Sequence, residues 1–278
     1  MHESPPYQAG FFCALAAAEP FFAYAPQATP RVIFSYFYML FSEYPLRPAS
    51  FATTLGSTVV VVPHPDDEAL GCGGLLTLLR QVGLPVAAAL VSDGTMSHPN
   101  SQEFPPTARR ELRYAEFRHA LAVLGVDENH EVLYLGLPDS QVPSAGPAFE
   151  QAAAQLADFI REKQADTVLV PWRRDPHPDH RATAALVATA LGQLPQPPRR
   201  LEYVVWAWER ADPADLPRPE EGTGFQLDVA AVLPTKQRAI AAHRSQLQPG
   251  TITDDPSGFL LSEHMLSHFA QPVEVYIE

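Results

Sequence analysis

The chain has 278 residues, which is enough for one large α/β domain or two small ones. Hydrophobic residues make up 46% of the chain and charged residues 18%, a balance typical of a folded globular protein. The formal net charge of −13 would repel a phosphate backbone, which argues against a nucleic-acid partner. Cys13 and Cys72 have no CxxC spacing, so a metal site in this chain must use histidine and carboxylate ligands.

The N-terminal segment lacks the pattern of a secretory signal. Residues 10–18 are apolar, but no lysine or arginine precedes them, and Glu3 lies where a signal peptide carries positive charge. Residues 32–41 form the longest other apolar run and are too short to cross a membrane. We therefore expect a cytoplasmic protein without a membrane span. Because the N-terminal region is rich in aromatic residues and prolines, we expect residues 1–55 to form an arm that packs on the body or contacts another copy of the chain.

The first half of the body shows short apolar runs separated by helical segments. Residues 59–62 are all valine, which predicts a strand buried on both faces of a sheet. The glycine-rich residues 71–74 lead into a predicted helix at 75–80, and 85–91 is a second predicted strand. A helix is predicted over 107–124, with Thr107 as its N-cap and Gly125 at its end.

The second half continues the alternation. Strands are predicted at 131–135, 167–170 and 201–208, with helices at 149–163 and 180–191. Residues 212–224, rich in proline and glycine, predict a surface loop or flap. The pattern indicates a single α/β domain over 56–278, in which a mostly parallel sheet carries helices on both faces.

Acidic residues and histidines follow two of the predicted buried strands. Residues 64–68 read His-Pro-Asp-Asp-Glu after the first strand, and residues 177–180 read His-Pro-Asp-His after the strand at 167–170. The carboxyl ends of parallel strands form the binding crevice of an open sheet, so both segments should face one cleft. Either segment alone is compatible with a turn, a solvated loop or an exposed helix start. Their joint placement favours a functional site.

The residue types in these segments suit a hydrolytic metal centre. Zinc hydrolases use three His, Asp or Glu ligands and keep a fourth position for water. His64, Asp67 and His180 would supply such a set. Asp66 is then the natural general base, because neighbouring carboxylates in an irregular turn can point to different tasks. A His-Asp-His set also accepts iron, cobalt or nickel.

Both segments, with Leu-Gly-Cys-Gly-Gly at 70–74 and Asp-Pro ahead of the second histidine pair, resemble the PIG-L/LmbE-like N-acetylglucosaminyl deacetylase family. The resemblance covers the chain from about Val59 to its end. It implies a Rossmann-like fold, one zinc ion per chain and hydrolysis of an N-acetyl group on a glucosamine unit. It also implies the following site residues: His64, Asp67 and His180 as metal ligands, Asp66 as base, His177 as the residue assisting the tetrahedral intermediate, and Asp179 as the carboxylate that orients His177 and raises its pKa.

Four further residues are expected at the substrate. The resemblance implies that Arg113 and Asp139 contact sugar hydroxyls, whereas the residues alone also allow a surface ion pair of Arg113 with Glu116 and a plain turn at Asp139. Some relatives carry a tyrosine before the second motif, where this chain has Trp172, Arg173 and Arg174. We expect Trp172 and Arg173 to bind substrate there, with arginine attracting an anionic group. Lys236 and residues 243–246 also resemble a family segment, with an expected structural or cleft-lining role.

The expected function is therefore zinc-dependent removal of an acetyl group from a small N-acetylglucosamine-type sugar or conjugate, giving acetate and a free amine. Two alternatives stay open at the level of the sequence. The chain could be an amidase of the same family that cuts a non-acetyl amide, or a zinc- and sugar-binding module without catalysis. Intact Asp66 and His177 favour catalysis, since a binding module needs neither a base nor an acid beside a metal. These motifs do not identify the group attached to the sugar.

Overall fold

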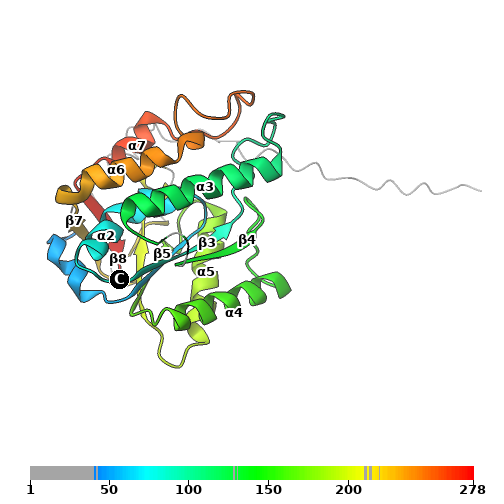
Figure 1. The fold of residues 1–278 in the computed structure, drawn as a ribbon. Helices are drawn as coiled ribbons and strands as arrows, with labels where there is room; N and C mark the ends of the chain where they lie inside the picture. Colours follow the sequence, from blue (N-terminus) through cyan, green and yellow to red (C-terminus); the bar gives the residue numbers. More distant parts are fainter. Residues whose placement is uncertain are drawn as a thin grey trace, which may run out of the picture.

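The computed structural model describes residues 41, 43–127, 129, 131–209, 212, 215–218 and 220–278. These residues form an eight-stranded sheet with the order β1-β7-β8-β6-β5-β2-β3-β4 (Figure 1). Neighbouring strands are parallel, except where β8 pairs antiparallel with β6 and β7. The strand bounds are β1 Leu46–Arg47, β2 Thr58–Val62, β3 Val86–Ser92, β4 Val132–Leu137, β5 Thr167–Pro171, β6 Arg199–Tyr203, β7 Gly224–Asp228 and β8 Val273–Ile277. The mostly parallel α/β fold predicted from the alternating pattern is confirmed.

Helices cover both faces of the sheet (Figure 1). One face carries α2, α3, α6 and α7, and the other carries α4 and α5. The valines of β2 alternate between these layers: Val60 and Val62 pack in the first core, Val59 and Val61 in the second. The helix bounds are α2 Asp67–Gln81, α3 Pro106–Leu124, α4 Pro147–Glu162, α5 Pro178–Gly192, α6 Leu233–Ala242 and α7 Glu263–Phe269. None of the described helices has the length and hydropathy needed to cross a bilayer.

The predicted arm falls mostly on residues 1–40, which lie outside the described residues. Its described end is joined to the sheet, because β1 pairs with β7 and the 3-10 helix η1, Ala49–Thr54, buries Ala52 in the core. Two further 3-10 helices matter below: η2, Trp206–Trp208, and η5, Arg244–Gln246.

Three local predictions were wrong. The helix expected at 75–80 begins at Asp67, so the glycine-rich residues lie inside it. Thr107 does not cap α3, because the helix starts at Pro106 after the extended Pro105; Gly125 does end it, in the left-handed conformation at φ 84°. The strand expected at 201–208 stops at Tyr203, and the chain then turns into η2. This turn brings Trp206 back over the site described next.

Candidate metal centre and active site

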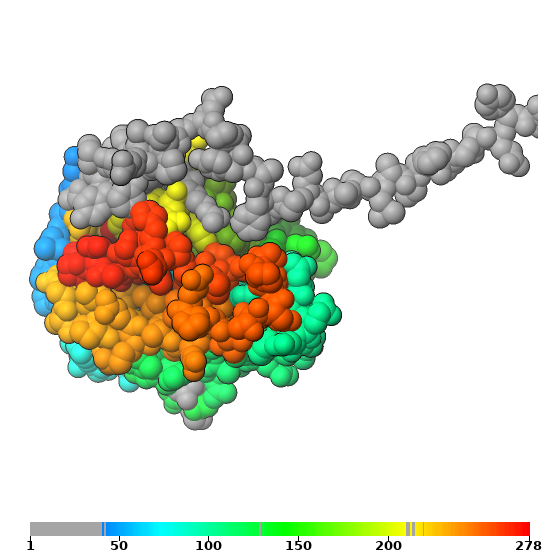
Figure 2. Space-filling model, turned by 90° about the horizontal axis from the view of Figure 1, so that it is seen from above, coloured from blue at the N-terminus to red at the C-terminus, as the bar shows by residue number. Residues whose placement is uncertain are grey.

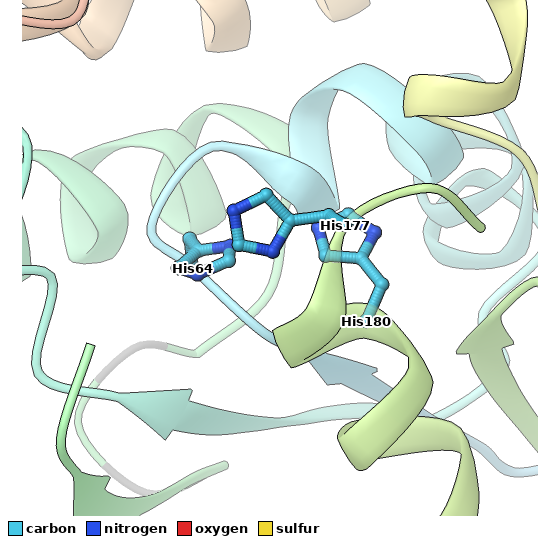
Figure 3. Close-up of side chains that lie close together, drawn as sticks. All are labelled: His64, His177 and His180. Carbon is cyan, nitrogen blue, oxygen red and sulfur yellow. The ribbon is translucent and has the colours of Figure 1, made fainter. Parts of the chain in front are cut away.

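Three histidines meet where β2 and β5 end. The strands are neighbours in the sheet, so the loop after β2 and the first turn of α5 after β5 lie side by side. Figure 3 shows the rings of His64, His177 and His180 gathered at this point. Each offers a nitrogen within 4.8 Å of the others. The two motifs therefore lie together at the carboxyl ends of neighbouring strands, as expected from the sequence.

Asp67 completes a compact donor set with two of these histidines. Its Oδ2 lies 3.4 Å from Nδ1 of His64 and 3.3 Å from Nε2 of His180. Ligands placed about 2.0–2.1 Å from a tetrahedral zinc are separated by about 3.3 Å, so these distances match the edges of a zinc tetrahedron. Among the described residues, neither buried ring nitrogen of His180 has a hydrogen-bond partner. A metal ion would satisfy Nε2 of that ring.

The neighbouring aspartates point in different directions because the backbone between strand and helix is unusual. Asp66 has φ 139° and ψ −27°, a backbone conformation that residues other than glycine rarely adopt. Its N–H donates to Oε2 of Glu68 at 3.1 Å, and Oε1 of Glu68 lies 2.6 Å from Nε2 of His243. Asp67 begins α2, whereas the Asp66 carboxylate turns toward Arg113, whose Nη2 lies 3.2 Å from Oδ2.

The pKa values of these two carboxyl groups shift in opposite directions. Burial raises the pKa of Asp66 to about 7, a rise that Arg113 opposes and the charge of Asp67 reinforces. Burial also disfavours the Asp67 carboxylate, but His180 and His64 outweigh it and hold the pKa of Asp67 well below its usual range. Asp67 is therefore anionic at neutral pH, and Asp66 can gain or release a proton there.

Asp179 does not act as the sequence predicted. Its Oδ2 lies 3.0 Å from Nε2 of His64, and the carboxylate accepts the N–H groups of Ser140 and Val142 at 2.7 and 3.1 Å. Only its backbone N–H reaches His177, donating to Nδ1 at 3.2 Å. Asp179 does raise the pKa of His177, but burial and the charges of His64 and His180 outweigh it and lower that pKa to about 3. The expected orienting contact of the carboxylate is made with His64 and not with His177.

His64 is held by carboxylates on both ring nitrogens. Nε2 faces Asp179 and also Asp139, whose Oδ1 lies 3.3 Å away, while Nδ1 faces Asp67. Burial opposes a charge on His64, but contacts with Asp139, Asp179 and Asp67 raise its pKa well above the ordinary value. A proton on Nε2, donated to Asp179, leaves Nδ1 as the nitrogen available to a metal shared with Asp67.

Arg113 is buried in the site and not paired on the helix surface. Its Nη2 donates to the carbonyl of Pro65 at 2.7 Å, and Nη1 lies 3.9 Å from Oδ2 of Asp139. Glu116 instead accepts the N–H and the hydroxyl of Ser245 at 2.8 and 2.6 Å. The surface ion pair that the residues alone allowed is therefore wrong.

The residues expected at the missing tyrosine position are engaged elsewhere. Trp172 is fully buried, and its indole N–H donates to the carbonyl of Asp215 at 2.8 Å. Arg173 forms an ion pair with the buried Glu202, with Nη2 2.8 Å from Oε1, and Arg174 pairs with Glu221. Direct substrate contact by Trp172 is therefore wrong, since its ring is part of the core. The charge of Arg173 is compensated by Glu202, so attraction of an anionic substrate group would compete with this ion pair.

Several residues around the site escaped the sequence reasoning. Asp175 places Oδ1 3.4 Å from Nδ1 of His180, and its Oδ2 accepts the N–H of Trp206 at 3.0 Å. The Trp206 ring lies 6.1 Å from that of His177, at an interplanar angle of 29°. Asp175 immediately precedes the second motif, which was a usable signal. Trp206 carried none, because only the turn after β6 brings it to the histidine.

Comparison with known proteins agrees with this geometry. The PIG-L family, described as GlcNAc-PI de-N-acetylase, matches residues 59–191. The chain is 32% identical over 218 residues to 2'-N-acetylparomamine deacetylase of Streptomyces fradiae, covering 69% of this chain and 74% of that protein. It is 32% identical over 254 residues to a 1D-myo-inositol 2-acetamido-2-deoxy-alpha-D-glucopyranoside deacetylase of Actinosynnema mirum, covering 77% and 88%.

A solved structure shares the fold. N,N'-diacetylchitobiose deacetylase from Pyrococcus horikoshii superposes with a TM-score of 0.57 at 20% identity, covering 80% of this chain and 81% of that one. Two relatives are 32% identical to this chain, which covers 74% and 88% of their lengths, and the family match includes both motifs. The chain belongs to the PIG-L family.

Proposed function

We propose that the protein is a metal-dependent hydrolase that removes an N-acetyl group from an amino-sugar conjugate, releasing acetate and a free amine. One observation carries the proposal: the pKa values of two adjacent aspartates shift in opposite directions. Asp67, with the lowered pKa, lies between two histidine nitrogens, and Asp66, with the raised pKa, lies beside them. Such a pair separates metal binding from proton transfer. The relatives' names share an acetylated glucosamine-type unit and differ in the attached group, which supports this substrate class.

Zn²⁺ is the ion we propose, held by His64, Asp67 and His180. The donors are two imidazoles and one carboxylate, the carboxylate oxygen lies at tetrahedral spacing from each imidazole nitrogen, and Asp175 and Asp179 orient the two rings from behind. When bound, the ion would supply a Lewis acid for the acetamide carbonyl and would favour deprotonation of a water molecule near neutral pH.

Asp66 is the proposed general base. A base is most effective when its pKa lies near the working pH, and that of Asp66 is raised to about 7. Arg113 fixes the carboxylate through Nη2, at 3.2 Å from Oδ2. Asp66 therefore takes the proton of the attacking water and, once protonated, can deliver it to the leaving amine nitrogen.

His177 is proposed to donate a hydrogen bond to the oxyanion. Its Nδ1 accepts the N–H of Asp179, so the proton of the neutral ring is on Nε2. With a pKa lowered to about 3, the ring is neutral at pH 7 and is a donor without being a strong proton source. Asp66 is therefore favoured over His177 as the proton donor to the leaving amine.

Arg113 and Asp139 were expected to contact sugar hydroxyls, and we propose positioning as the first task of each. Arg113 holds the base, and Asp139 holds His64 while its Oδ2 accepts the N–H of Met96 at 2.8 Å. Both side chains are buried, so any sugar would meet only their edges.

The test is acetate release by purified, zinc-loaded protein from a panel of N-acetylglucosamine conjugates that differ in the attached group. We expect turnover of at least one conjugate by the wild type and a rate at least about 10²-fold lower for Asp66→Asn. A parallel panel of longer acyl chains on the same amine separates deacetylation from the cleavage of other amides, since a small pocket rejects the long chains. Protein that binds zinc and sugar but releases no acid from either panel would refute the assignment.

A further inference from the structure

A second group of histidines and a carboxylate lies outside the active site. Glu209 follows η2, and His264 and His268 lie on α7, one helical turn apart. One ligand atom from each of the three side chains lies within 4.8 Å of those of the other two. None of the three belongs to the two motifs, and no step of the proposed reaction uses them.

The helix presents both histidines toward the same point. Residues four apart in an α-helix share a face, and the two ring centroids lie 5.1 Å apart. The hydroxyl of Ser262 accepts the N–H of Met265 at 3.0 Å and so fixes the first turn. The ring of His268 stacks on Trp208 at 5.4 Å with an interplanar angle of 11°, which fixes its orientation as well. Two of the three donors are thus preorganised.

The surroundings of the donors suit a cation. Oε1 of Glu209 is buried and has no hydrogen-bond partner among the described residues, and a buried carboxylate oxygen is costly unless it meets a donor or a positive charge.

We propose that Glu209, His264 and His268 form a second metal site for a divalent first-row transition ion, with Zn²⁺ as the probe ion. Two imidazoles and one carboxylate are a donor set that zinc accepts, and three protein ligands leave a fourth position for water. α7 belongs to the C-terminal part of the chain, drawn in orange to red, which lies at the molecular surface in Figure 2. His264 is exposed, which gives an ion a route of entry.

This site lies at the other end of η2 from the active site. Trp206, at the start of η2, packs against His177, and Trp208, at its end, packs against His268. An ion held by Glu209 and α7 would brace the turn that carries both indoles. Binding should therefore change the tryptophan fluorescence of the protein as well as its metal content.

The experiment is a titration of metal-free protein with Zn²⁺ against a chromophoric chelator, with tryptophan fluorescence followed in parallel. We expect two equivalents per chain for the wild type, and one for His264→Ala and for Glu209→Gln. Asp67→Ala should also bind one equivalent, now at the second site, and the double variant Asp67→Ala/His264→Ala none. His119→Ala is the matched control, because His119 is an exposed histidine on α3, and it should keep two.

The outcomes are decisive in both directions. A single equivalent in the wild type, or two equivalents in His264→Ala, would overturn the second site. Because His264 is exposed, its replacement opens no core, and thermal unfolding of the metal-free variants checks that the fold is intact. The result is independent of the proposed reaction, since acetate release is not measured and Asp67→Ala removes the first site alone.

Discussion

At the scale of single residues, the two adjacent aspartates are the sharpest test of the proposed chemistry. Asp66→Asn keeps the shape of the side chain and removes the base, so we expect zinc binding to persist while kcat falls by about 10²–10⁴-fold. Asp67→Ala removes the carboxylate shared by His64 and His180, and we expect the first zinc to be lost. Zinc content and acetate release measure the two effects. Equal zinc loss in both variants would contradict the division of labour.

The buried pair of Glu68 and His243 supports the strained backbone of Asp66. Glu68 accepts the Asp66 N–H with one oxygen and contacts His243 with the other. Removing one partner of a buried ion pair leaves an uncompensated charge, so we expect His243→Ala to lower the free energy of unfolding by about 3 kcal/mol. Denaturant unfolding measures this loss.

The matching control is a double-mutant cycle. Glu68→Gln/His243→Ala removes both charges and should lose less stability than the two single variants added together. Simple additivity would mean that the two side chains are not coupled.

Much of the site could be predicted from the residues, and the limits have a physical cause. The convergence of His64, Asp67 and His180 follows from two motifs at the ends of two buried strands, and the structure brings the three together. The partner of Asp179 and the burial of Trp172 could not be predicted, because packing between distant segments decides where those side chains point. These ligand and catalytic roles stay predictions until they are measured.

At the scale of elements, α2 shows why its glycines misled the sequence prediction. Glycine disfavours the interior of a helix by about 1 kcal/mol relative to alanine, which placed the expected start of the helix after the glycine run. The helix tolerates that cost because it packs close to its neighbours. A Cβ on Gly71 would lie 2.4 Å from the Tyr203 ring, and one on Gly74 would lie 2.6 Å from Val229. The Glu274 carboxylate also accepts the N–H groups of Gly74 and Leu75, at 2.7 and 2.9 Å.

This packing makes an alanine substitution unfavourable where helix propensity alone would favour it. We expect Gly71→Ala to destabilise the protein by about 1–3 kcal/mol, because the Tyr203 ring is fully buried and cannot move aside cheaply. Gly192→Ala is the control, since Gly192 ends α5 and nothing lies within 4 Å of the added Cβ. That variant should be neutral or slightly stabilising in the same denaturant series. A stabilised Gly71→Ala would show that the close approach is not limiting.

At the scale of the whole molecule, His268 should shape the acid limit of stability. Its pKa is lowered to about 4 by burial and by His264, so the folded state binds a proton less readily than the unfolded state does. The stabilisation is complete above the ordinary histidine pKa of about 6.5 and is lost as pH falls from there toward 4. In chelator-treated protein, we expect His268→Gln to flatten the fall in unfolding free energy over this range. An unchanged pH slope would contradict the assignment.

The strand order explains why the site lies where it does and how much of the fold the sequence could reveal. The alternation of strands and helices predicts the parallel part of the sheet, but β8 enters antiparallel between β6 and β7, a pairing between distant segments that no local pattern encodes. The order reverses at β2, which lies between β5 and β3. From β2 the chain continues into α2 on one face, and from β5 into α5 on the other. Such a reversal opens a crevice at the carboxyl ends of the strands.

The proposed first metal therefore joins the two layers of the fold. Asp67 belongs to α2 and His180 to α5, so an ion between them links helices on opposite faces of the sheet. Binding to the folded state alone adds RT ln(1 + [L]/Kd), about 4 kcal/mol when free zinc is 1,000 times Kd. We expect chelation to lower the thermal midpoint of His264→Ala, which keeps only the first site, and to leave that of Asp67→Ala/His264→Ala unchanged. If chelation still lowered the thermal midpoint of the double variant, the stabilising ion would lie elsewhere. An unchanged midpoint in the double variant would show that one ion at the first site holds the two helical layers together.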